Sequence, residues 1–102
     1  MAMRMKIGNR DWNVLVVNRD EIDGCDGRTI PNDLTIKIAN DLRAETTITT
    51  FIHEVVHATL DSQGRCYQKK FDLEDMCEFI AWQFFEIERL AKEFVEEVLN
   101  HE

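Results

Sequence analysis

The sequence lacks several features that define whole classes of protein. No apolar run approaches the roughly 20 residues that a membrane-spanning helix needs, so we expect no membrane segment. No apolar stretch follows the basic residues near the N-terminus, which argues against a secretory signal there. There is also no internal repeat, low-complexity tract or interdomain linker. We therefore expect residues 1–102 to form a single domain in the cytoplasm.

Cysteine and positive charge are also scarce. The three cysteines, Cys25, Cys66 and Cys77, are odd in number and widely spaced, without a CxxC pair. This weighs against a disulfide framework and against a zinc ribbon. Lys and Arg together number 12 against 20 Asp and Glu, which gives a formal net charge of −8. A nucleic-acid partner is therefore not expected, because phosphate binding needs a basic patch.

What the sequence does contain predicts an α+β fold. Hydrophobic residues make up 44% of the chain, which is ordinary for a globular domain. Before about residue 41 the pattern is typical of strands and turns, with strands expected at Met3–Ile7, Trp12–Val17 and Leu34–Ile38. After that point the pattern is helical. We expect a small N-terminal antiparallel sheet of about three strands, then a site-bearing helix and a long C-terminal helix.

The first helix is expected from about Glu45 to Ser62. Thr46 and Thr47 are candidate N-caps, and Gly64 is a suitable stop after the last turn. At 100° per residue, one broad arc is mostly apolar: Ile48, Phe51, Ile52, Val55, Val56 and Thr59. The opposite side is polar: Thr50, His53, Glu54, His57 and Asp61.

The second helix is expected to begin at Asp72 and continue to about Leu99. Asp72 is a plausible N-cap, with Asp75 three residues later completing a capping box. One apolar stripe follows a nearly heptad spacing: Leu73, Met76, Ile80, Phe84, Ile87, Ala91, Phe94 and Val98. We expect the start of this helix to pack against the first helix. Its C-terminal half is expected to project and to pair with a second copy as a homodimer.

The first helix carries the motif His-Glu-x-x-His, at His53, Glu54 and His57. Residues four apart lie on one helix face, so the two imidazoles can converge on one ion. Zinc accepts histidine nitrogen at roughly 2.0–2.1 Å, a geometry that such a pair meets without strain. Glu54 is rotated about 100° from His53, so its carboxylate can reach a water on the ion without displacing a ligand. The other interpretation is that these three residues are simply on the solvent-exposed face of an amphipathic helix and bind no metal.

A catalytic zinc site usually needs a third protein ligand. Asp61 is too far along the same helix, because eight residues span about 12 Å. The acids near the start of the second helix are the better source, and Glu78 is favoured because apolar neighbours surround it and a carboxylate there needs a partner. Glu74 and Asp75 remain alternatives, and so does a plain surface role for Glu78.

The motif, followed by a glutamate on the next helix, resembles the gluzincin arrangement of zinc metallopeptidases. The approach Thr46–Ile52 and the motif itself are similar to small phage-encoded HExxH proteins. The resemblance covers roughly residues 34–85 and implies that His53, His57 and Glu78 ligate Zn²⁺ while Glu54 acts as general base. The larger gluzincins place an Asn before this glutamate and an Asp four residues after it, and neither is present here.

We therefore expect a zinc metallopeptidase that hydrolyses peptide bonds through a zinc-bound water. A peptide or protein substrate is expected to add a strand to a sheet edge formed by Leu34–Ile38. Tyr67 is a candidate oxyanion stabiliser, although a packing role is the simpler interpretation. Two alternatives remain open: a metal-binding module that acts through a partner without peptidase activity, and a purely structural helical protein.

Overall fold

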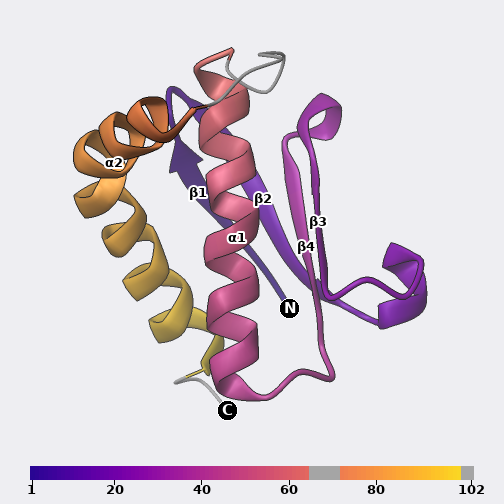
Figure 1. Ribbon diagram of the computed structural model, residues 1–102. Helices are drawn as coiled ribbons and strands as arrows, with labels where there is room; N and C mark the ends of the chain where they lie inside the picture. The colour runs from indigo at the N-terminus through magenta and orange to yellow at the C-terminus, as the bar shows by residue number, and fades with distance from the viewer. Residues whose placement is uncertain (65–71, 100–102) are drawn as a thin grey trace.

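A computed structural model describes residues 1–64 and 72–99. A four-stranded sheet forms one layer and two helices cover one of its faces (Figure 1). The strands are β1 (Ala2–Ile7), β2 (Arg10–Val17), β3 (Gly27–Ile30) and β4 (Thr35–Ala39), and the helices are α1 (Ala44–Ser62) and α2 (Leu73–Phe94). The predicted α+β class is confirmed, with the sheet before the helices.

The sheet is mixed, with strand order β1-β2-β4-β3. β1 and β2 form an antiparallel hairpin with Met5 opposite Trp12. β4 then runs parallel to β2, with Val14 opposite Ile36, and antiparallel to β3. The expected antiparallel sheet of about three strands was therefore wrong in its strand number and in one pairing. The expected sheet edge at Leu34–Ile38 was also wrong, because β4 is hydrogen-bonded on both sides.

The missed strand is β3, which is short and lies at the sheet edge. Gly27 opens it and Pro31 follows it, so the local composition is typical of a loop. It forms because Thr29 and Ile30 pair with Ile36 and Thr35 of β4. Tertiary pairing therefore overrides the local turn signal. The tight connection from β3 to β4 is completed by Leu34, which adopts a left-handed backbone conformation.

α1 has nearly the predicted bounds, but its start differs. The N-cap is Arg43, one turn earlier than predicted, and it provides no side-chain cap. Thr47 instead lies inside the first turn, where its hydroxyl donates to the backbone oxygen of Arg43 at 2.9 Å. The helix ends near the predicted stop, since Gly64 has a φ of +72° and its amide donates to the carbonyl of Asp61.

α2 begins as predicted. The Asp72 carboxylate accepts from the amide of Asp75 at 2.9 Å, and the Asp75 side chain accepts from the amide of Asp72 at 3.2 Å. The helix continues through a π-helical turn at Val95–Leu99.

The packing of α2 differs from the prediction. Its C-terminal half does not project but is buried, with Leu90 and Phe94 in the core and Val98 of the following turn beside them. In the N-terminal half Phe79 is buried, but six large apolar side chains are exposed: Leu73, Met76, Ile80, Trp82, Phe84 and Phe85.

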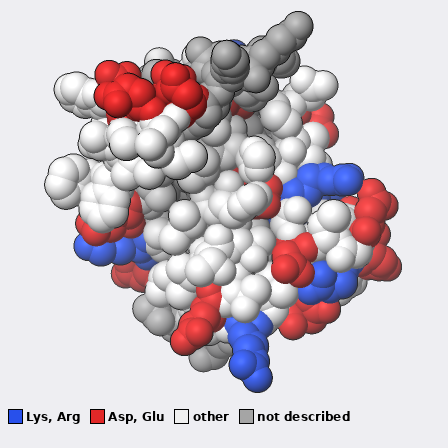
Figure 2. All heavy atoms as spheres, in the orientation of Figure 1, with Lys and Arg blue, Asp and Glu red and all other residues white. Residues whose placement is uncertain are grey.

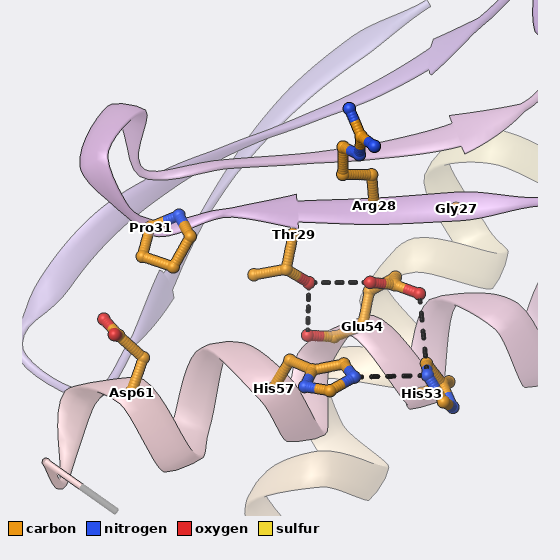
Figure 3. A pocket seen from close by; sticks show the side chains of 8 residues that line it. All are labelled: Gly27, Arg28, Thr29, Pro31, His53, Glu54, His57 and Asp61. Carbon is orange, nitrogen blue, oxygen red and sulfur yellow. Dashed lines mark hydrogen bonds and ion pairs between the residues drawn. The ribbon is translucent and has the colours of Figure 1, made fainter. Parts of the chain in front are cut away.

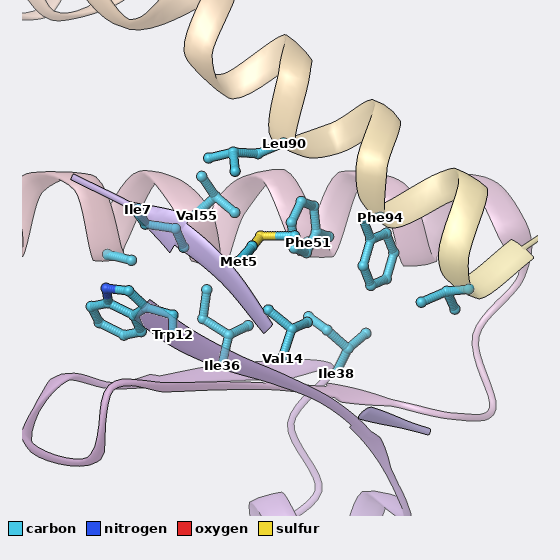
Figure 4. Packing of buried hydrophobic residues seen from close by; sticks show 12 residues of the cluster. Met5, Ile7, Trp12, Val14, Ile36, Ile38, Phe51, Val55, Leu90 and Phe94 are labelled. Atoms are coloured by element: carbon cyan, nitrogen blue, oxygen red, sulfur yellow. The ribbon is translucent and has the colours of Figure 1, made fainter. Parts of the chain in front are cut away.

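The core lies between the sheet and the two helices (Figure 4). Phe51 of α1 stacks on Phe94 of α2, with ring centroids 4.1 Å apart. Val55 and Leu90 lie nearby in the same cluster (Figure 4), which fixes α1 in rotation about its axis. That rotation determines which α1 side chains face the edge strand β3. Within the described residues, neither helix has the length and apolar character needed to cross a bilayer.

Candidate metal centre

The polar side of α1 faces β3 across a shallow hollow of about 460 Å³ (Figure 3). Both elements contribute to its wall: Gly27, Arg28, Thr29, Pro31, His53, Glu54, His57 and Asp61. The predicted motif residues therefore share one concave surface. Asp61 lies at the end of the hollow nearer the C-terminus of α1, one turn beyond His57 (Figure 3).

The two histidines converge at the mouth of this hollow. Their Nε2 atoms are 3.2 Å apart, and the side chain of His53 is 68% exposed. Two nitrogens bound tetrahedrally to one zinc ion at the usual bond length are about 3.3 Å apart. The pair therefore has the separation of two ligands on one ion. A hydrogen bond between the two rings has the same length and would need one ring nitrogen protonated and the other bare.

Glu54 is buried, contrary to the expectation that it shares the exposed face of the helix. Only 7% of the residue is exposed, because β3 lies over it. Its Oε2 atom is 3.9 Å from Nε2 of His53. Within the described segments no Lys or Arg forms an ion pair with it. A buried carboxylate that lacks a cationic partner is costly, and a metal ion held by the adjacent histidines would supply the missing positive charge.

Two residues of β3 hold Glu54 in place. Oγ1 of Thr29 lies 2.8 Å from Oε1 of Glu54 and 3.0 Å from its backbone oxygen, so the single hydroxyl hydrogen is shared between two acceptors. Gly27 leaves the space that Glu54 occupies. A Cβ atom at this position would lie 2.7 Å from Cγ2 of Thr50 and 3.1 Å from Cγ of Glu54. The Thr29 hydroxyl therefore orients the carboxylate, and the lack of a Cβ atom at Gly27 leaves room for it.

This arrangement leaves Oε2 of Glu54 as the oxygen directed toward the histidines (Figure 3). The Thr29 hydroxyl engages the other oxygen, Oε1. A general base needs one carboxylate oxygen that can accept a proton and a second that fixes its orientation. Glu54 meets both requirements.

The structure does not bring a third predicted ligand close to His53 and His57. In residues 1–64 and 72–99, no three His, Cys, Asp or Glu side chains are grouped as a metal would require. Glu78 is exposed on α2, and Glu74 and Asp75 lie in the same first turns. α2 and β3 flank opposite sides of α1 (Figure 1). Glu78 as third ligand therefore stays a prediction, and so do the alternatives Glu74 and Asp75.

Sequence reasoning missed Gly27, Arg28 and Thr29. Their strand is only four residues long and follows a glycine-containing loop, so no period-two pattern could be recognised. The one local signal was the pair of β-branched residues Thr29 and Ile30. Arg28 also lines the hollow, but its guanidinium points away from the histidines (Figure 3) and forms an ion pair with Asp23 at 3.1 Å. Tyr67, the predicted oxyanion candidate, lies outside the described residues.

Comparison of this chain with family models, with curated proteins and with solved structures gives no match. Any functional conclusion therefore depends on the residues of the centre themselves.

Proposed function

We propose that this protein is a zinc-dependent metallopeptidase, with His53 and His57 as metal ligands and Glu54 as general base. The observation that carries the proposal is the 3.2 Å separation of the two Nε2 atoms beside a buried carboxylate. These residues fit two ligand positions of a catalytic zinc and the base that accompanies it. When bound, the ion would acidify a water molecule and polarise a substrate carbonyl.

The chain's own residues would then perform the proton transfers. Oε2 of Glu54 accepts a proton from the attacking water and later returns it to the leaving amine. Thr29 keeps the carboxylate oriented through Oε1.

We propose that an extended peptide substrate docks on β3, and not on β4 as the sequence suggested, because β4 is paired on both sides. In the part of the chain that the structure describes, β3 is an edge strand paired on one side with β4, and it lines the hollow with Gly27 and Thr29. An extended peptide that pairs with its open edge would pass in front of the histidines. A crystal structure with a bound peptide mimic tests this: a ligand seated away from β3 would overturn the docking mode without affecting the metal centre.

Metal content and turnover together test the enzyme. We expect about one zinc per chain in the wild type and its loss in the double variant His53→Ala/His57→Ala. Glu54→Gln should keep zinc and lose peptide cleavage, because the amide cannot accept the proton. Cleavage is measured with a broad peptide library, and retained cleavage by Glu54→Gln would refute the role of Glu54.

A second function is supported by the lack of a third ligand among the described residues. A metal-binding module that acts through a partner does not catalyse hydrolysis. It therefore needs neither a reactive water on the metal nor the full set of ligands and general base that a peptidase requires. Zinc binding without cleavage of any library peptide by the wild type would favour this module. The absence of zinc binding would exclude both functions.

A further inference from the structure

A second hollow, of about 480 Å³, adjoins the metal centre on the side of the N-terminus of α1. It shares Gly27, His53 and Glu54 with the hollow of Figure 3, which extends the other way to Asp61. Its other lining residues are all polar: Asp26, Thr46, Thr49 and Thr50. Together the two hollows follow α1 from Thr46 to Asp61, a rise of about 22 Å. An extended peptide of about seven residues has this length.

The backbone of β3 determines which side chains of a docked peptide would face α1. The amide of Ala39 donates to the carbonyl of Asp26 at 2.8 Å, in register with the pairing of β3 and β4. Backbone groups alternate in direction along a strand, so those of Arg28 also face β4, whereas those of Gly27 and Thr29 face the open edge. A strand added at this edge would pair with Gly27 and Thr29. Peptide residues opposite these two would point their side chains toward α1.

The peptide residue opposite Gly27 would be the one nearest the second hollow, because Gly27 lines that hollow and Thr29 does not. Hydroxyl groups are available there to bind it. The Thr49 hydroxyl donates to the carbonyl of Thr46 at 3.1 Å, and its oxygen can still accept a hydrogen bond. Within the described segments the hydroxyls of Thr46 and Thr50 form no hydrogen bond, so each can both donate and accept.

The charges around the second hollow discriminate between classes of side chain. Its charged walls are Glu54 and Asp26, whose carboxylate accepts from Arg19 at 2.8 Å, and among the described residues no Lys or Arg lines it. Figure 2 shows mostly uncharged side chains along α1, with Lys and Arg toward the margins of this face. An acidic side chain would therefore be repelled, and a basic one would be brought toward the metal ion. An apolar side chain would remove the hydroxyls from water without replacing their hydrogen bonds.

We propose that the second hollow is a substrate subsite that selects an uncharged polar side chain, glutamine or asparagine above all, opposite Gly27. A carboxamide can donate to the oxygens of the threonine hydroxyls and accept from their hydrogens at the same time. Thr46 and Thr50 would then be specificity-determining residues. The proposal rests on the proposed function, because it needs a peptide docked on β3.

Peptide binding tests the subsite without relying on cleavage. Four peptides of about six residues are alanine except for one central guest residue, which is Gln, Leu, Glu or Lys. Each is titrated in the presence of ZnCl₂ into the full chain carrying Glu54→Gln, and amide shifts are followed by nitrogen-15 NMR. We expect the Gln peptide to bind about tenfold more tightly than the other three, because only its guest replaces the hydrogen bonds to water. The amides of Gly27, Thr46, Thr49 and Thr50 should shift.

A pair of matched variants tests the role of the hydroxyls. Thr46→Val/Thr50→Val keeps the shape of both side chains and removes the hydroxyls, so the Leu peptide should now bind about threefold more tightly than the Gln peptide. Thr46→Ser/Thr50→Ser keeps the hydroxyls and should keep the preference for Gln. Circular dichroism checks that the variants are folded. Thr46→Val alone, with a smaller change in the same direction, replaces the double Val variant if that does not fold.

Two results would overturn the subsite. Equal affinities for the four guests, absence of binding included, or tightest binding of Leu, Glu or Lys would refute the selection of an uncharged polar side chain. Shifts that leave Thr46, Thr49 and Thr50 unchanged would place the guest elsewhere. The enzyme proposal fails separately: a preference for Gln without cleavage by the wild type would refute the peptidase alone, and cleavage without a guest preference would refute the subsite alone.

Discussion

At the scale of single residues, the metal centre depends on the contacts that β3 makes with Glu54. The carboxylate is buried, yet its polar side-chain neighbours among the described residues are the hydroxyl of Thr29, at 2.8 Å, and the imidazole of His53, at 3.9 Å. Such a group is poorly compensated unless a cation binds beside it. Poor compensation is common at functional sites, where stability is given up for chemistry. The contribution of each β3 residue can be measured separately.

Replacement of Thr29 by Val should lower the free energy of unfolding by about 1–3 kcal/mol, because a buried carboxylate oxygen loses its donor. Thr29→Ser keeps the hydroxyl and is the matched control, with a smaller loss expected. Urea denaturation measures both. Equal losses for Val and Ser would show that the methyl group of Thr29, and not its hydrogen bond, stabilises the contact.

Replacement of Gly27 by Ala should destabilise the protein by about 1–3 kcal/mol, since the new Cβ would overlap Cγ2 of Thr50. Thr50→Ser removes that methyl group. A double-mutant cycle should therefore show that the cost of Gly27→Ala falls in the Thr50→Ser background. Strict additivity of the two changes would contradict the close approach of β3 to α1.

At the scale of elements, the sequence predicted helices far better than it predicted the sheet. α1 and α2 each follow a long apolar periodicity that identifies them without tertiary information. β3 has only four residues and exists through its pairing with β4, which no local pattern reports. The parallel pairing of β2 with β4 is likewise a property of the whole chain. Glu54 was misplaced for the same reason, because its burial comes from β3.

The periodicity of α2 also could not tell which half is buried. Both halves carry the same apolar stripe, and the contact between Phe94 and Phe51 selects the C-terminal half. The His-Glu-x-x-His motif, in contrast, depends only on helical spacing, and the two histidines do converge as predicted. The third ligand depends on how α2 is placed, which local patterns do not determine.

The two halves of α2 should respond differently to truncation. Phe94→Ala should lower the free energy of unfolding by about 3–5 kcal/mol, because a stacked, fully buried ring is lost. Trp82→Ala, a comparably large truncation, should change it by no more than about 0.5 kcal/mol, since Trp82 is 82% exposed. A large loss for Trp82→Ala in thermal or urea unfolding would mean that the N-terminal half is covered.

At the scale of the whole molecule, Arg19 links the segments that lead into the site. Its guanidinium donates to Asp41, just before α1, and to Asp26, just before β3. The segments that enter α1 and β3 are thereby joined through one side chain. These hydrogen bonds with Arg19 lower the pKa of Asp41 below its usual value of 3.8.

A lowered pKa in the folded state makes the contribution of Asp41 depend on pH. Its stabilisation is fully present above the unfolded pKa and is lost as the pH falls through the lower folded pKa. We expect Asp41→Asn to lower the melting temperature near neutral pH and to have progressively less effect as the solution is acidified below about pH 4. A melting difference that stays constant down to about pH 2 would show that the Arg19–Asp41 pair is not responsible.

The central claim is that His53 and His57 bind one metal ion beside Glu54. Anomalous diffraction at the zinc absorption edge, from crystals grown with ZnCl₂, tests it most directly. We predict a single peak about 2.0–2.1 Å from Nε2 of each histidine, with Oε2 of Glu54 directed toward it but not bound. The same map would identify the third ligand. No peak between the two rings, with their 3.2 Å contact retained, would contradict the metal centre and leave only a hydrogen-bonded histidine pair.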